Sequence, residues 1–330
     1  MAAPEQLPGC QRQFHQRWSW LNDPHVRTLA WLLDAPDMLD ASAPMWQGRI
    51  AGLGPDAALE ARDWLAALER DPATLHARLA VHRYTRLGRY AEQLLSFYFT
   101  HLGILEGQGI QVRRGSQTIG EFDFLLRQQN GLVHRELATK VYLLRSSGEG
   151  VRRADYFVGP NLADTLGAKM SKIIERQLSL SSHPSAASAL PGPVVEAGAL
   201  VKGWLFYPEG EEVTGAALPG LSPAHCRGSW RTLHSQRQRA AGERYLVLQR
   251  LQWLTPQSAM YADTVDEAGA IDRVEQAFAA QPMPVMLATM QEEQGQWRET
   301  ERFFVVPDDW VARVGSSRHA ASFPVFDSRD

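Results

Sequence analysis

Two consecutive runs of alternating polar and apolar residues constrain the fold of this chain most strongly. Residues 121–126 read Glu-Phe-Asp-Phe-Leu-Leu, and residues 134–140 read His-Arg-Glu-Leu-Ala-Thr-Lys. Such alternation is typical of half-buried β-strands, and the Asn-Gly pair between the runs is a strong signal for a tight hairpin turn. The sequence therefore predicts an antiparallel hairpin that turns at Asn130 and Gly131.

This turn would fix which residues of the two strands face each other. Asp123 should face Ala138, with Glu136 diagonally across from Asp123 at about 7–8 Å. Glu121 should face Lys140. The opposite face should carry the mostly apolar set Phe122, Phe124, Leu126, Leu137, Thr139 and Val141. One face of the predicted hairpin is thus apolar, and the other is rich in charge.

The charged face suits a hard divalent cation. Asp123 and Glu136 would offer carboxylate oxygens from adjacent strands, which Mg²⁺ prefers, and Mg²⁺ keeps several waters for substrate phosphates. A nearby lysine can orient an attacking water or stabilise developing phosphate charge. We therefore expect Mg²⁺ or Mn²⁺ at Asp123 and Glu136, with Lys140 beside it.

An acid on one strand, followed by an acid and a lysine on the next, resembles the PD-(D/E)xK nuclease superfamily. More narrowly, the chain is similar to the bacterial domain-of-unknown-function family 1853, which lies near that superfamily. This resemblance implies a restriction-endonuclease-like α/β core, with a mixed central sheet flanked by helices, that hydrolyses phosphodiester bonds in DNA or RNA. The segments that carry the narrower resemblance are residues 86–92, 120–124, 134–140, 159–161 and 302–308.

The resemblance also implies roles for individual residues. Asp123, Glu136 and the carbonyl of Leu137 would hold the metal. Glu92, on the helix before the hairpin, would add a carboxylate that acts through water, and Lys140 would activate or orient the attacking water. Glu92 borders the apolar stripe of that helix, so it could lean into a cleft or remain solvated.

The lysine departs from the superfamily pattern. The usual spacing would place it at Ala138, whereas Lys140 comes two residues later on the same strand face, about 6.6–6.8 Å further along. Lys140 could reach back over that distance, or it could form only an ion pair with Glu121. Lys169 and Lys172, on the helix expected after the hairpin, could contact phosphates, supply the missing lysine or lie on a solvated face.

One histidine shares the charged face of the hairpin. His134 could position a water or a phosphate, or it could be a structural side chain with no contact to substrate.

The remaining pattern divides the chain into three parts. Residues 1–85 read as a tryptophan-rich helical N-terminal extension, residues 86–207 as the nuclease-like core, and residues 208–330 as a C-terminal α/β extension packed on the core. Periodicity predicts helices over 86–100, from 164 to about 180 and over 264–280, with strands near 109–114, 120–127, 132–145, 199–207, 244–254, 284–290 and 301–306.

Composition and charge narrow the function classes. The formal charge of −3 gives no overall attraction to nucleic acid, but residues 101–182 hold 11 Lys and Arg against 8 Asp and Glu, which is compatible with a phosphate backbone. Cys10 and Cys226 have no metal-ligand spacing, and the N-terminus lacks the apolar segment of a signal peptide. No apolar run approaches the roughly 18 residues of a spanning helix. We therefore expect a soluble cytoplasmic protein that binds nucleic acid and no membrane.

Two functions follow from the sequence. The first is a Mg²⁺-dependent nuclease, and the second is a catalytically inactive nuclease-like module that binds nucleic acid or a protein partner. Metal binding at Asp123 and Glu136 separates the two, because the inactive module need not bind Mg²⁺ or Mn²⁺ there.

Overall fold

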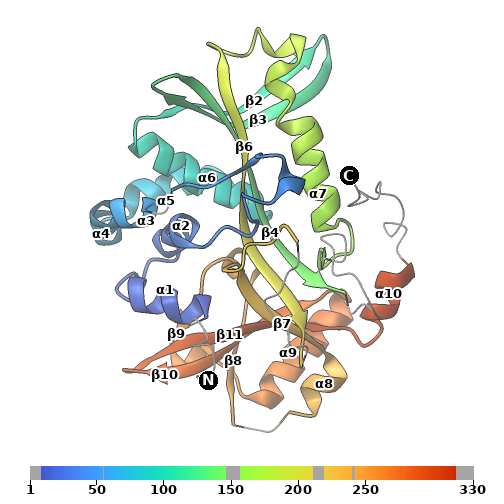
Figure 1. The fold of residues 1–330 in the computed structure, drawn as a ribbon. Helices are drawn as coiled ribbons and strands as arrows, with labels where there is room; N and C mark the ends of the chain where they lie inside the picture. The colour runs from blue at the N-terminus through green and yellow to red at the C-terminus, as the bar shows by residue number, and fades with distance from the viewer. Residues whose placement is uncertain (1–8, 55, 146–156, 211–218, 240–241, 317–330) are drawn as a thin grey trace, which may run out of the picture.

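A single mixed sheet forms the centre of the protein (Figure 1). The computed structural model describes residues 9–54, 56–145, 157–210, 219–239 and 242–316 of the 330-residue chain. The long strands are β2 (Leu105–Arg114), β3 (Gln117–Gln128), β4 (Gly131–Leu144), β6 (Val194–Pro208), β7 (Cys226–Thr232), β8 (Arg244–Val247), β10 (Val285–Glu293) and β11 (Gln296–Val306). The short strands are β1 (Ile50–Ala51), β5 (Phe157–Val158) and β9 (Ser258–Ala259).

The sheet joins the middle of the chain to its C-terminal third. Its strands follow the order β2-β3-β4-β6-β7-β11-β10-β8. The central strands β4, β6, β7 and β11 pair in parallel, whereas the pairs on either side are antiparallel. The predicted mixed α/β architecture is therefore confirmed, and the C-terminal strands extend the same sheet.

Helices cover both faces of this sheet (Figure 1). The helix α6 (Leu87–His101) lies on one face together with the N-terminal helices, and α7 (Leu166–Lys172) lies on the other. No helix in the described part of the chain is long and apolar enough to cross a bilayer. The other helices are α1 (Cys10–Trp18), α2 (Pro24–Asp34), α3 (Ala57–Glu60), α4 (Arg62–Arg70), α5 (Ala73–Ala80), α8 (Leu233–Arg237), α9 (Glu267–Ala280) and α10 (Trp310–Ser316).

The strand β4 is buried on both faces, as strands covered by helices on two sides usually are. Successive side chains of a strand point to opposite faces. Leu137 and Val141 accordingly join the apolar cluster around α6, whereas Ala138 and Tyr142 join the cluster around α7. The elements that carry the candidate site are thus fixed by packing from both layers.

The predicted hairpin forms, but the predicted turn is wrong. Gln128 pairs with Gly131, so the turn consists of Gln129 and Asn130. Gly131 is a strand residue with φ of 138°, and a Cβ there would lie 2.8 Å from Val195 Cγ1. Glycine is needed at this position because Val195 at the start of β6 lies so close to it. The turn therefore falls one residue earlier in the chain than predicted.

This change shifts the hairpin register by two residues. Because side chains alternate with a period of two, a shift of two keeps every residue on its expected face but changes its partner. The pairing of Phe124 with Arg135, continued by one residue, places Asp123 opposite Glu136 instead of opposite Ala138. The register therefore brings the two acids closer together than the sequence suggested.

The predicted apolar face of the hairpin is correct with one exception. Phe124 contacts Phe99 of α6, with ring centroids 5.2 Å apart. Phe122 instead contacts His134 edge-on at 4.7 Å and belongs to a cluster on the other face with Leu180. The regular alternation of β3 is thus interrupted at Asp123, between the two phenylalanines.

The helix after the hairpin begins one residue later and ends earlier than predicted. Thr165, not Asp164, caps α7, because its side chain accepts a hydrogen bond from the amide of Ala168 at 3.1 Å. Asp164 is instead an acceptor for a lysine of β4. One π-helical turn (Ile173–Gln177) completes α7, so the helical segment stops short of residue 180.

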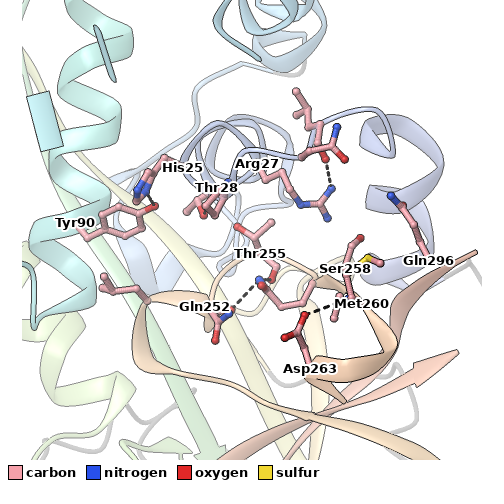
Figure 2. Close-up of a pocket in the computed structure, with 16 residues that line it drawn as sticks. His25, Arg27, Thr28, Tyr90, Gln252, Thr255, Ser258, Met260, Asp263 and Gln296 are labelled. Carbon is pink, nitrogen blue, oxygen red and sulfur yellow. Dashed lines mark hydrogen bonds between the residues drawn. The ribbon is translucent and has the colours of Figure 1, made fainter. Parts of the chain in front are cut away.

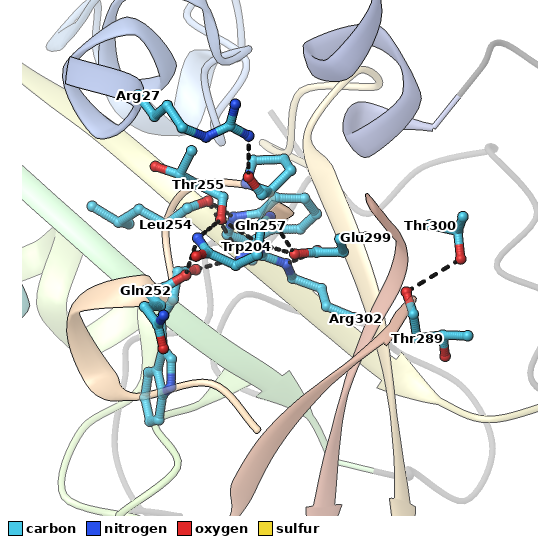
Figure 3. A network of polar contacts seen from close by, with 12 residues as sticks. Arg27, Trp204, Gln252, Leu254, Thr255, Gln257, Thr289, Glu299, Thr300 and Arg302 are labelled. Atoms are coloured by element: carbon cyan, nitrogen blue, oxygen red, sulfur yellow. Dashed lines mark hydrogen bonds and ion pairs between the residues drawn. The ribbon is translucent and has the colours of Figure 1, made fainter. Parts of the chain in front are cut away.

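A buried polar network ties the N-terminal helices to the C-terminal strands (Figure 3). Arg302 of β11 forms a bidentate ion pair with Glu299, with Nε–Oε1 and Nη2–Oε2 distances of 2.6 and 2.8 Å. Arg27 of α2 donates to the carbonyl of Pro256 at 2.8 Å. The segment between β8 and β9 is therefore held from two sides.

Candidate functional site

Asp123 and Glu136 meet where β3 and β4 separate. The hydrogen-bonded pairing of the two strands ends at Phe124 and Arg135. Beyond this point, Asp123 Oδ2 accepts a hydrogen bond from the amide of Leu137 at 3.0 Å, and Glu136 Oε1 accepts from the amide of Asp123 at 3.4 Å. Each carboxylate thus replaces a backbone acceptor that is lost where the strands diverge.

Glu136 is held by its neighbours on both oxygens. Its side chain is 1% exposed, with Oε1 2.8 Å from His134 Nε2. Oε2 accepts a hydrogen bond from Gln177 at the end of the α7 segment. Burial raises the pKa of Glu136 to about 7. The structure therefore orients this carboxylate before any ligand arrives.

His134 lies behind Glu136, away from the pocket. It is fully buried, and burial lowers its pKa to about 4, so the imidazole is neutral near pH 7. The predicted contact of His134 with water or phosphate has no support in this placement. Its observed contacts are structural, because the ring packs against Phe122 and positions Glu136.

Glu92 adds a third carboxylate near Asp123 and Glu136. Burial raises the pKa of Asp123 to about 7, and the charge of Glu136 adds to this effect. Burial, followed by the charge of Asp123, raises the pKa of Glu92 as well. Glu92 Oε2 accepts from Arg89 at 2.9 Å, and Arg89 also binds Glu121 at 3.1 Å. Glu92 is half-buried and lines a cleft, which agrees with one of the two alternatives expected from the sequence.

The lysines are arranged differently from the first expectation. Lys140 Nζ lies 2.8 Å from Asp164 Oδ2, so Lys140 pairs neither with Glu121 nor with the two hairpin acids. Lys169 of α7 is half-buried, and its charge lowers the pKa of both Asp123 and Glu136. Its Nζ lies 3.4 Å from Gln177 Oε1, next to Glu136. Lys172 is exposed on the same helix.

A pocket of about 580 Å³ opens beside these groups. The first turns of α6, the middle of β4 and the loop between β5 and α7 form most of its wall. Glu92, Leu137, Lys140 and Lys169 all line it, together with Arg250 from the C-terminal third. Asp123 and Glu136 are not among its lining residues, so a substrate in this pocket would contact Glu92 and Lys169 directly and would lie one residue along β4 from Glu136.

One family model, described as a domain of unknown function (DUF1853), matches residues 27–306. The chain belongs to this family. The match covers α6, the hairpin, α7 and the last strand of the sheet, so every residue of the pocket lies in the DUF1853 region. No curated protein and no solved structure matches the chain.

The two hairpin acids of this DUF1853 protein offer oxygen donors of the type and charge that a hard cation prefers. Asp123 and Glu136 are half-buried and buried carboxyls, and burial raises the pKa of each to about 7. Across the described residues, no three His, Cys, Asp or Glu side chains are grouped to hold a metal ion. A cation would therefore depend on the two carboxylates, backbone oxygen and water.

Sequence reasoning missed three contributors to the site. Gln177 binds Glu136, Asp164 binds Lys140, and Arg250 reaches the pocket from the C-terminal third. The first two depend on how α7 packs against β4. Arg250 begins the turn at 250–252, just before Trp253, and no local pattern marks it as part of a site in the middle of the chain.

Proposed function

We propose that this DUF1853 protein is a divalent-metal-dependent nuclease of the PD-(D/E)xK type that hydrolyses phosphodiester bonds in DNA or RNA. The observation that supports this best is the meeting of Asp123 and Glu136 at the divergence of β3 and β4. Two adjacent, buried carboxyls repel each other when both are ionised, and a bound cation relieves that repulsion. The adjoining pocket is lined by Leu137 and Lys169, the immediate neighbours of these acids, and a substrate bound there would lie beside them.

The metal would be held by Asp123, Glu136 and the carbonyl of Leu137, and Glu92 would assist through water. When bound, Mg²⁺ or Mn²⁺ polarises the phosphoryl group and lowers the pKa of a coordinated water. The protein's own contribution begins with His134 and Gln177, which fix the orientation of Glu136.

The ammonium of Lys169 would supply the positive charge that the sequence analysis assigned to Lys140. It lies close enough to both acids to influence their ionisation, and it lines the pocket. There it would orient the attacking water or stabilise the charge that develops on the phosphate. Lys140, bound to Asp164, would instead shape the pocket wall.

A second candidate is the inactive nuclease-like module that binds nucleic acid or a protein partner. It is favoured by the engagement of both Glu136 oxygens with His134 and Gln177, which leaves little of this carboxylate for a metal. In that case the acids and the pocket would be an inherited scaffold.

A cleavage assay decides between the two candidates. The purified protein should degrade or nick labelled DNA or RNA in millimolar Mn²⁺ or Mg²⁺. Asp123→Asn and Glu136→Gln should each stop cleavage, whereas Asp272→Asn, on the exposed surface of α9, should not. If no single- or double-stranded substrate is cut and Mn²⁺ leaves the melting temperature unchanged, the nuclease proposal is wrong and the inactive module replaces it.

A further inference from the structure

The turn at 250–252 and the residues after it lie between two cavities. Arg250 and Trp253 face the pocket beside the acids. Gln252 and Thr255 line a second cavity of about 310 Å³, opposite Tyr90 of α6 (Figure 2). The segment therefore forms a shared wall that packs against the N-terminal half of α6.

Buried side chains clamp the backbone of this wall (Figure 3). Arg302 donates to the carbonyls of Trp253 and Thr255 at 2.5 and 2.9 Å, while its other contacts hold Glu299. Trp204 Nε1 donates to the carbonyl of Leu254 at 2.7 Å. Three consecutive carbonyls are thus satisfied by groups from β6 and β11, and the position of the wall is fixed by the sheet.

The clamp places one arginine at the edge of the pocket. The Arg250 guanidinium lies over the Trp253 ring, with Cζ 5.3 Å from the ring centroid. Such stacking restricts the guanidinium without neutralising it. The side chain of Arg250 is exposed, so its hydrogen-bond donors remain accessible.

Charge pairing in the pocket separates two kinds of basic residue. Arg89 is paired with Glu92 and Glu121, and Lys140 is paired with Asp164. Arg86, at the N-terminus of α6, and Arg250 line the same pocket and are exposed, and neither has a carboxylate partner among the described residues. The pocket therefore presents two accessible guanidinium groups whose charge is not compensated.

From this arrangement we infer that Arg86 and Arg250 form a phosphate-binding subsite for the nucleic acid backbone, built jointly by α6 and the C-terminal wall. The inference rests on the proposed function, which supplies the substrate class. Guanidinium groups bind phosphate oxygens through paired, charge-assisted hydrogen bonds. The subsite holds a phosphate next to the one at Asp123 and Glu136, so the C-terminal third positions the strand while the hairpin carries the chemistry.

Binding without cleavage tests this subsite. Anisotropy of short fluorescein-labelled oligo-dT and oligo-U is measured in EDTA over a series of salt concentrations. Arg250→Ala and Arg86→Ala should each weaken binding and lower the slope of log K against log salt by about 0.7, the value for one lost phosphate contact on a single strand. Arg250→Lys should restore the slope but not the full affinity, because lysine keeps the charge and loses the paired donors.

The matched control is Arg273→Ala, which removes an exposed arginine of α9. It should leave affinity and slope unchanged. The subsite is overturned if Arg250→Ala and Arg86→Ala bind like the unaltered protein, if Arg273→Ala weakens binding equally, or if the unaltered protein binds neither oligonucleotide. A preference for oligo-dT or oligo-U identifies DNA or RNA as the source of the phosphate.

The binding measurement tests the subsite, and the cleavage assay tests the nuclease proposal, so either can fail without the other. Binding that depends on Arg250 in a protein that cuts nothing keeps the subsite and removes the nuclease. Normal cleavage and normal binding by Arg250→Ala keep the nuclease and remove the subsite.

Discussion

Asp123 and Glu136 each accept a hydrogen bond from the strand that carries the other. Asp123 Oδ2 binds the amide of Leu137 at 3.0 Å, and Glu136 Oε1 lies 3.4 Å from the amide of Asp123. The acids therefore hold the diverging strands together as well as forming the candidate metal site. Amide replacements keep an oxygen acceptor at each position, whereas alanine would leave backbone donors unsatisfied. Asn and Gln are consequently the informative variants.

The two lysines should respond differently to neutral replacement. Lys169→Met should lower metal-dependent cleavage by about 100-fold or more, because it removes the ammonium beside both acids. Lys140→Met should leave activity within a few-fold, since Lys140 is bound to Asp164. Single-turnover rates with saturating Mn²⁺ measure both effects. The reverse order would restore the catalytic role first expected of Lys140.

Stability without metal should depend on pH through Asp123. The folded pKa of about 7 lies above the ordinary value of 3.8, so the folded state binds more protons than the unfolded state between about pH 4 and 7. This stability is present at low pH and is lost as the pH rises toward 7. Asp123→Asn removes the titrating group and should raise the free energy of unfolding at pH 8 by roughly 1–3 kcal/mol.

The measurement is the difference in melting temperature between the unaltered protein and Asp123→Asn at each pH in EDTA. Taking the difference cancels the opposite trend of buried histidines away from the site, such as His225, whose lowered pKa favours the fold at higher pH. Millimolar Mn²⁺ should then stabilise the unaltered protein and not the variant. An Asp123→Asn protein that is less stable than the unaltered protein at pH 8 would contradict the repulsion between the two acids.

Local pattern was sufficient for the hairpin strands and, except for Phe122, for their faces. It failed over 244–254, where the strand ends at Val247 and a turn follows at Arg250–Gln252, and it missed β7. Alternation located β3 and β4, and helical periodicity located α6. The faces survived the error in the turn because the register differs by two residues and not by one. The predicted turn and the predicted contacts of Lys140 were wrong because they depend on distant segments. Val195 of β6 occupies the space beside Gly131, and Asp164, after β5, forms an ion pair with Lys140. No pattern near residue 131 or 140 encodes those neighbours.

Only the acidic residues of the site could be predicted from the sequence. Asp123, Glu136 and Glu92 follow from spacing on the hairpin and on α6. The structure places Asp123 beside Glu136 and leaves Glu92 on the wall of the neighbouring pocket. Arg250 could not be assigned from its own surroundings. Its position depends on Arg302, more than 50 residues further along the chain, which clamps the carbonyls after it.

Breaking the buried clamp should be costly. Arg302→Met leaves the Glu299 carboxylate buried without its partner, and removing one member of a buried ion pair costs about 3–5 kcal/mol. The double variant Glu299→Gln with Arg302→Met should lose less than the sum of the single losses, because no uncompensated charge remains. Urea unfolding of the three variants measures this coupling. Additive losses would show that the pair does not stabilise the fold as a unit.

The position of the hairpin turn gives a last prediction. Gly131→Ala should destabilise the protein by about 1 kcal/mol or more, because an alanine at φ of 138° is strained and its Cβ would lie 2.8 Å from Val195 Cγ1. Adding Val195→Ala should recover the part of the loss that comes from the contact and leave the backbone strain. Asn130→Ala, in the turn itself, should cost less than Gly131→Ala. If both Gly131 variants unfold at the same urea concentration as the unaltered protein, β6 does not press on this position, and the reason given for the shifted register is wrong.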